Sequence, residues 1–187
     1  MHYRISFNGS LYEPQCNALR NSIASAALTA SCESITVLFS SGGGSTDQGF
    51  ALYNFLRSFN KPLHFHAVGS VGSMAFPVFL GVSMRTASPT ASFLMHSFDY
   101  TFEGKQSIAQ IEEALLRLKA DAASYRSAVT LSTKIAADTV NKVLTAHLPP
   151  IVYHAEDAKA AGIVSEVVEL NPDGQDQGGV QVWTVGW

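Results

Sequence analysis

The sequence has few charged residues and few cysteines. Charged residues make up 14% of the 187 positions, against about 25% in an average domain, whereas hydrophobic residues make up 47%. A surface with so little charge is typical of a chain that is partly covered by other copies, so we expect a homo-oligomer. The two cysteines, Cys16 and Cys32, form neither a metal-binding nor a disulfide pattern, which favours a reducing compartment.

An excess of positive charge is absent as well. The net charge is -3 and the pI is near 6, so the chain lacks the excess of positive charge that is typical of nucleic-acid-binding proteins, and we exclude that class. The N-terminus enters alternating strand residues without the charged and apolar regions of a signal peptide. Residues 62–84 carry no charge, but their histidines, glycines and Pro77 favour a buried strand, turn and helix over a membrane span. We expect a cytoplasmic protein that does not enter membranes.

Strand-like and helix-like periods alternate along the first third of the chain. Residues 3–7 alternate as a strand, and apolar residues recur at helical spacing over 16–27. Residues 34–40 are mostly β-branched or apolar, as in a strand covered on both faces, and 63–68 indicate the next strand. Between them, Ser45 and Gln48 fit a capping box that opens a second helix. This order predicts an α/β fold with right-handed crossovers and a largely parallel sheet.

The second half of the chain is dominated by one helical pattern. Apolar residues step by three and four from Ile108 to Val129, which predicts a long amphipathic helix. Such a helix lies on its own core or forms an oligomer seam, and periodicity alone favours the first. The length predicts one domain over residues 1–170 and a tail over 171–187. We expect the tail to be a flexible linker that ends in a short strand or a docking peptide.

Three segments together supply the parts of a nucleophilic site. They are the glycine turn 41–44 (Ser-Gly-Gly-Gly), the segment around Ser73, and an apolar run that ends in His96. A serine is a poor nucleophile at neutral pH and needs a base and donors aimed at the developing oxyanion. The turn and Ser73 both follow predicted strands, and in parallel sheets sites form at the carboxyl ends of strands.

Other interpretations of these residues are weaker. Taken singly, Ser73 fits a helix cap and His96 a core histidine. His64 and His66 share one face of a strand but lack a third ligand nearby, so we expect no metal site. The glycine turn lacks both the G-x-G-x-x-G pattern and the lysine of a P-loop, so we expect no nucleotide and no cofactor.

Five motifs in chain order resemble those of the ClpP-type serine peptidases, over residues 4–168. The resemblance implies the ClpP/crotonase fold, an α/β fold of repeated ββα units with a mostly parallel sheet and a protruding handle helix. The chain is identified as a divergent member of that family. The motifs are the glycine turn 40–44, Gly72-Ser73-Met74, a histidine signature with Arg85, Pro89 and residues 93–96, the start of the handle helix at 104–106, and a closing segment at 158–164.

The resemblance implies a role for each matching residue. Ser73 is expected to be the nucleophile and His96 the base, and the backbone N–H groups of Gly44 and Met74 to form the oxyanion hole. The implied activity is endopeptidase hydrolysis of peptides or unfolded protein through an acyl-enzyme, within a ring of identical subunits.

The chain also departs from the family. The aspartate of the family's triad falls on Pro149-Pro150, so Asp138, Asp99 or Asn141 is a candidate third member. The same departure puts double-ring assembly in question. Residues 99–102 replace the glycines of the family's handle strand with bulkier side chains, which predicts a narrower or differently selective peptide groove. Since the first core strand starts at the N-terminus, we do not expect an ATPase partner that docks through N-terminal loops.

Two rival functions stay open. One is a catalytically inactive ClpP-like structural subunit. The other is a crotonase-type acyl-CoA enzyme, which shares the fold. The joint presence of Ser73 and His96 argues against the acyl-CoA enzyme, because that chemistry needs no serine nucleophile.

Overall fold

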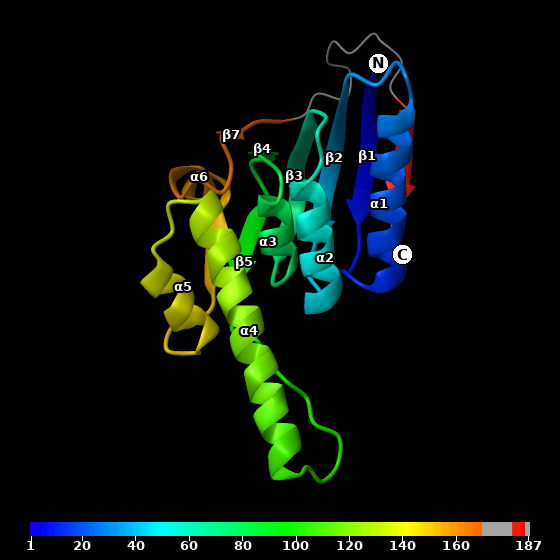
Figure 1. The fold of residues 1–187 in the computed structure, drawn as a ribbon. Helices are drawn as coiled ribbons and strands as arrows, with labels where there is room; N and C mark the ends of the chain where they lie inside the picture. Colours follow the sequence, from blue (N-terminus) through cyan, green and yellow to red (C-terminus); the bar gives the residue numbers. More distant parts are fainter. Residues whose placement is uncertain (170–180, 186–187) are drawn as a thin grey trace.

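The computed structural model describes residues 1–169 and 181–185, which fold into one twisted sheet with helices packed on a face of it (Figure 1). The helices are α1 (Glu13–Leu28), α2 (Thr46–Arg57), α3 (Ala75–Leu80), α4 (Ile108–Ser132), α5 (Ala137–Leu144) and α6 (Ala155–Ala160). The strands are β1 (His2–Asn8), β2 (Ser34–Ser41), β3 (Leu63–Gly72), β4 (Met84–Ala87), β5 (Ser92–Met95), β6 (Ile151–His154), β7 (Glu166–Val167) and β8 (Gln181–Val185).

The sheet is mostly parallel, as predicted. Its strand order is β6-β5-β3-β2-β1-β8, with β4 against β3 and β7 against β4. Every pair is parallel except β5 with β6, which is antiparallel. β3 runs four residues beyond the end that the sequence predicted, to Gly72, and pairs first with β4 and then with β5. This extension brings the chain directly to Ser73.

The first strands and helices follow the predicted apolar pattern. Alternate residues of β1 are buried, and so are residues of one face of α1. In β2 the alternation is between buried and half-buried residues, so the expectation of a strand fully covered on both faces is wrong for the single chain. Phe7, Phe39 and Phe65 come from three adjacent strands, and successive ring centroids lie 5.3 Å apart. Each buried ring contributes about 1.5–3 kcal/mol through its removal from water.

Only half of the predicted capping box forms at the start of α2. The hydroxyl of Ser45 accepts a hydrogen bond from the N–H of Gln48 at 3.3 Å. The N–H of Ser45 donates to the carbonyl of Leu11 at 3.0 Å and so is not available to the Gln48 side chain. The N–H of Leu11 also donates to the carbonyl of Gly43 at 2.8 Å, so the loop before α1 ties the glycine turn and the N-cap residue of α2 to the body of the domain.

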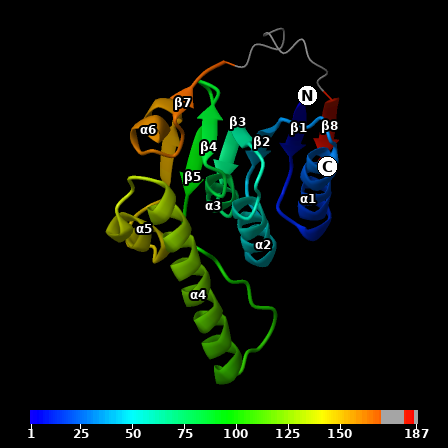
Figure 2. The same cartoon turned by 45° about the horizontal axis from the view of Figure 1, so that its top comes forward.

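Helix α4 packs on its own core mainly along its second half, since in its first half only the small side chain of Ala114 is buried. Tyr125, Ala128 and Val129 are buried there, whereas Ile108 is 76% exposed and Leu116 is 68% exposed. Both views show the first half of α4 extending beyond the other helices (Figures 1 and 2). The expected protruding handle helix is confirmed, and the expectation that the whole apolar face packs on its own domain is wrong for the first half.

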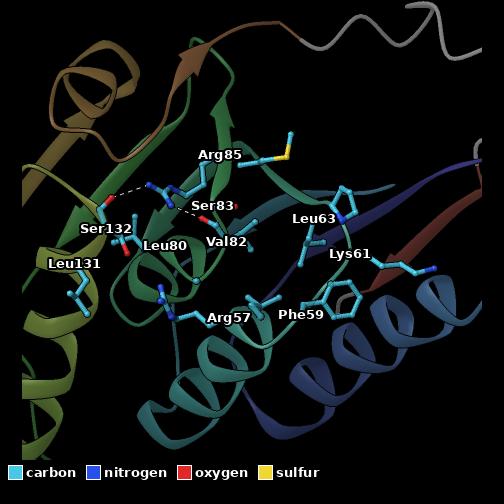
Figure 3. A pocket seen from close by; sticks show the side chains of 14 residues that line it. Arg57, Phe59, Lys61, Leu63, Leu80, Val82, Ser83, Arg85, Leu131 and Ser132 are labelled. Atoms are coloured by element: carbon cyan, nitrogen blue, oxygen red, sulfur yellow. Dashed lines mark hydrogen bonds between the residues drawn. The ribbon is translucent and has the colours of Figure 1, made fainter. Parts of the chain in front are cut away.

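A half-buried arginine holds three segments together at the amino ends of the strands. Arg85 donates from Nε to the carbonyl of Ile163 at 2.7 Å and from Nη2 to the carbonyl of Ser132 at 3.0 Å. It also donates to the carbonyls of Val82 and Gly162 beside a cavity of about 500 Å³ (Figure 3). Burial lowers the pKa of the guanidinium below its usual range. The arginine of the histidine signature thus fastens the strand that leads towards His96.

The tail forms a strand where the structure describes it. β8 adds to the edge of the sheet in parallel with β1, which confirms the predicted short strand. The predicted linker over residues 171–179 lies outside the described residues. Among the helices of residues 1–169, none combines the length and the apolar character that a membrane crossing requires.

Candidate active site

Ser73 stands in a strained turn between a strand and a helix. β3 ends at Gly72 and α3 begins at Ala75, so Ser73 and Met74 alone make the turn. Ser73 has a φ of 53°, in the left-handed region that non-glycine residues rarely adopt. Its N–H donates to the carbonyl of Leu94 in β5 at 3.0 Å. A strained backbone costs on the order of 1–3 kcal/mol and is typical of functional positions.

The glycine turn packs directly on this serine. A Cβ atom at Gly43 would lie 2.7 Å from Cβ of Ser73 and 2.9 Å from the nitrogen of Met74. Gly43 also has a φ of 102°, so both space and conformation require glycine. A Cβ atom at Gly44 would lie 2.8 Å from backbone atoms of Leu11. The turn is therefore fixed between the loop before α1 and the nucleophile segment.

Of the backbone N–H groups around Ser73, some donate a hydrogen bond within the described structure and others do not. The N–H of Gly43 donates to Oγ of Ser41 at 3.2 Å. The N–H groups of Gly44 and Met74 have no acceptor within residues 1–169 and 181–185. Unused donors on both sides of a serine are what an oxyanion hole requires.

His96 leaves the sheet beside Ser73. It follows β5 by one residue, and β5 pairs with β3 through Leu94 and Gly72, so the two side chains emerge from neighbouring parallel strands at the same edge. Nδ1 of His96 lies 2.6 Å from the carbonyl oxygen of Ser97. Because a carbonyl only accepts hydrogen bonds, Nδ1 carries the proton and Nε2 has the free lone pair. In the described part of the chain no hydrogen bond joins Oγ of Ser73 to His96.

The three candidate third members lie elsewhere. Asp138 pairs with Lys142 at 2.7 Å on the exposed face of α5. Asn141 accepts a hydrogen bond from Arg126 at 2.9 Å. Asp99 is exposed and lines a cavity. None of them hydrogen-bonds His96 within the described residues. The group that contacts Nδ1, the imidazole nitrogen a triad aspartate would bind, is instead the carbonyl of Ser97.

Two neighbours of the site were not identified from the sequence. The hydroxyl of Tyr125 in α4 donates to the carbonyl of Ser73 at 3.4 Å, and burial raises the pKa of this phenol. The Tyr125 ring also contacts Phe98, with centroids 5.6 Å apart. Periodicity placed Tyr125 on the apolar face of the helix but not against Ser73. Nothing in the sequence distinguished the carbonyl of Ser97, because every residue has one.

The segment after His96 differs from the expected handle strand. Residues 99–102 pair with no strand within the described chain. Tyr100 and Phe102 instead contact each other, with ring centroids 4.8 Å apart. This aromatic pair lies where the glycines of the family's handle strand were found to be replaced by bulkier side chains.

The two strand histidines are held by hydroxyl groups. Nε2 of His64 and Nδ1 of His66 lie 2.8 and 2.7 Å from Oγ1 of Thr86, and Nε2 of His66 lies 2.9 Å from Oγ of Ser88. Burial, with a smaller effect of His64, lowers the pKa of His66 to about 4. No group of three His, Cys, Asp or Glu side chains able to hold a metal occurs among the described residues.

The chain is similar to known proteins in sequence and in structure. A family profile described as Clp protease matches residues 2–171. The chain belongs to the Clp protease family. A mutant of ClpP1 from Listeria monocytogenes has a similar structure, with a TM-score of 0.75 and 17% sequence identity, over 91% of this chain and 93% of that chain. No curated protein sequence matches.

Family membership confirms the resemblance that the five motifs indicated. The Listeria structure, at its low identity, shows that the fold is shared. The chain is thus a ClpP-type peptidase by family, with a mixed α/β fold and a mostly parallel sheet. The acyl-CoA alternative loses its support, since the family match is to peptidases.

Proposed function

We propose that this Clp protease family member hydrolyses peptide bonds with Ser73 as nucleophile and His96 as base. The observation that carries the proposal is the left-handed turn of Ser73, which is held against Gly43 and followed by the unused N–H of Met74. A serine that only capped a helix would need no such strain.

The reaction follows from these groups. Nε2 of His96 accepts the proton of Ser73 as Oγ attacks the peptide carbonyl, and the N–H groups of Gly44 and Met74 bind the oxyanion. The C–N bond then breaks, and the leaving amine takes the proton from Nε2. A water molecule, deprotonated by the same nitrogen, attacks the acyl ester, whose C–O bond breaks as Ser73 recovers its proton. These steps require Nε2 of His96 to come within hydrogen-bond distance of Oγ of Ser73. In many enzymes this distance shortens only when substrate binds.

The carbonyl of Ser97 takes part of the role of the missing aspartate. It holds His96 in the tautomer whose Nε2 accepts a proton, at 2.6 Å from Nδ1. A neutral carbonyl stabilises the imidazolium less than a carboxylate does, so we expect slow turnover. In this proposal Asp99, Asp138 and Asn141 do not act on the imidazole.

We further propose a homo-oligomer of ring type that acts on extended or unfolded peptide segments in the cytoplasm. The exposed apolar residues of α4 support the assembly, because exposed side chains such as Ile108 and Leu116 are covered when copies associate. The domain boundary near residue 170, the lack of cofactors and the lack of an N-terminally docked ATPase partner stay predictions.

Labelling with an uncharged fluorophosphonate tests the catalytic assignment. We expect covalent modification of Ser73, shown by peptide mass spectrometry, and a complete loss with Ser73→Ala. His96→Ala should abolish labelling while circular dichroism and the assembly state remain as in the wild type. Labelling of Ser73→Ala at the wild-type rate would overturn the nucleophile assignment.

One rival function has an observation in its favour. Oγ of Ser73 and His96 share no hydrogen bond in the described chain, and no carboxylate faces the imidazole. Both features suit a catalytically inactive structural subunit. A correctly assembled wild type that stays unlabelled by the fluorophosphonate would favour this rival.

A further inference from the structure

A cavity of about 250 Å³ lies between the start of α2, the loop after His96 and the middle of α4. Two of the residues that line it are close in the chain to the site: Thr46 follows Gly44 by two residues, and Phe98 follows His96 by two residues. The Phe98 ring contacts Tyr125, whose hydroxyl donates to the carbonyl of Ser73. Residues that line the cavity therefore lie two positions along the chain from the glycine turn and from the base, and one of them contacts the support of the nucleophile.

This position matches that of one substrate side chain. In the proposed reaction the attacked carbonyl binds its oxygen to the N–H groups of Gly44 and Met74. The side chain of the same substrate residue starts from the atom next to that carbonyl carbon. It must therefore enter a space near the turn, and the cavity is lined by Thr46 and Asp47, which follow the turn directly after Ser45.

The charge that lines the cavity is mainly negative. Asp47 from α2, Asp99 from the loop after His96 and Asp121 from α4 all line it. The one cation of the lining, Arg117, is paired with Glu113 at 3.2 Å. None of the three aspartates has an ion-pair partner within the described residues. Three carboxylates around one cavity favour a cation within it over an anion, because opposite charges attract and like charges repel.

The rest of the lining is apolar or aromatic. Phe98, Tyr100 and Leu118 contribute to the same cavity. Lysine and arginine side chains combine an apolar stem with a cationic head, so they match both parts of this lining. A cation can also bind over the face of Tyr100. A leucine would desolvate the carboxylates without pairing them, and an acidic side chain would be repelled.

We propose that this cavity selects lysine or arginine at the substrate residue whose carbonyl is attacked, so that the enzyme cleaves after basic residues. The proposal rests on the peptidase function proposed above. Asp47, Asp99 and Asp121 are its specificity-determining residues, and the walls of Phe98, Tyr100 and Leu118 hold the side-chain stem.

Two phosphonate probes that differ in one charge test the proposal. They are tripeptidyl diphenyl phosphonates with lysine or with norleucine at the reacting position. We expect the wild type to react about tenfold faster with the lysine probe, since three exposed charge pairs of about 0.2–1 kcal/mol act together. The ratio of the two rates should shrink when salt is raised from about 50 mM to about 500 mM.

Matched variants assign the preference to the cavity. Asp99→Asn and Asp121→Asn should each lower the ratio of rates about two- to fivefold, and with Asp47→Asn added the two rates should become equal within about twofold. Glu112→Gln removes one exposed carboxylate from the same helix α4 outside the cavity, and it should leave the ratio unchanged. The fluorophosphonate carries no charged side chain, so Glu112→Gln should label as the wild type does, and the phosphonate rates of each aspartate variant are divided by its own fluorophosphonate labelling rate.

Two outcomes overturn the specificity proposal. One is a norleucine probe that reacts with the wild type as fast as the lysine probe while the fluorophosphonate still labels Ser73. The other is a ratio that the triple variant leaves unchanged. If no reagent labels the wild type, the peptidase proposal fails instead, and the cavity is judged by binding of the lysine and norleucine tripeptide amides to Ser73→Ala. Equal affinities for the two amides would then overturn the charge preference.

Discussion

Substitution of Gly43 by alanine tests the contact between the glycine turn and Ser73. The new Cβ atom would lie 2.7 Å from Cβ of Ser73, whereas carbon atoms in contact are about 3.5–4.0 Å apart. The turn and the nucleophile segment must therefore separate by about 1 Å. The φ of 102° at Gly43 adds strain to the alanine variant, because residues with a side chain rarely adopt that backbone conformation.

The expected effects on activity and stability differ in size. A displacement of about 1 Å at a catalytic group lowers reactivity about hundredfold, so we expect that loss in fluorophosphonate labelling of Ser73. The positive φ should lower the free energy of unfolding by about 1–3 kcal/mol, measured by urea denaturation. Labelling rates are compared below the melting temperature of both proteins, so that unfolding does not enter the comparison.

Gly42→Ala is the matched control. No heavy atom lies within 4 Å of a Cβ atom at Gly42, and its φ lies outside the left-handed range. We expect its labelling rate to stay within about threefold of the wild type and its stability to change by less than about 0.5 kcal/mol. A folded Gly43→Ala protein that labels as fast as Gly42→Ala would refute the packing of the turn on the nucleophile.

Three further predictions concern the base, the assembly and the buried histidine. Asp99→Asn and Asp138→Asn should each leave fluorophosphonate labelling within about threefold of the wild type, because neither carboxylate touches His96; a loss of orders of magnitude at either would identify the missing third member. Light scattering at micromolar concentration should show a multimer, and Leu116→Glu should weaken it; a stable 20 kDa particle would show that α4 serves only its own domain. The pKa of His66 is about 4 in the folded chain and about 6.5 when unfolded, so the unfolded chain takes up the proton first as pH falls. Stability should therefore be full above pH 6.5 and fall by about 1–3 kcal/mol towards pH 4, measured by urea unfolding. His66→Gln should weaken this dependence and leave the smaller part that comes from His64, whose pKa burial also lowers. An identical pH profile in the variant would show that another group titrates.

Local pattern was sufficient to predict the elements that carry the site. Alternating and helical apolar spacing predicted the positions of β1, α1, β2 and α2 to within a few residues. This works because an element that is buried on one face has apolar residues at a regular spacing in the sequence. The same spacing predicted α4 from Ile108 to Val129, three residues short of its end at Ser132. It could not tell which half of that helix packs on its own core, since one apolar face suits a core or a partner equally.

Motif order likewise led from the sequence alone to the family and to Ser73, His96 and the glycine turn. The details of the site depended on contacts between residues far apart in the chain. Gly43 rather than Gly44 packs on Ser73, Tyr125 supports its carbonyl, and the carbonyl of Ser97 faces His96. Ser73 itself has a left-handed φ that its residue type does not predict. Such contacts and strains are imposed when the crossovers bring β3, β5 and α4 together, so only the tertiary structure decided them.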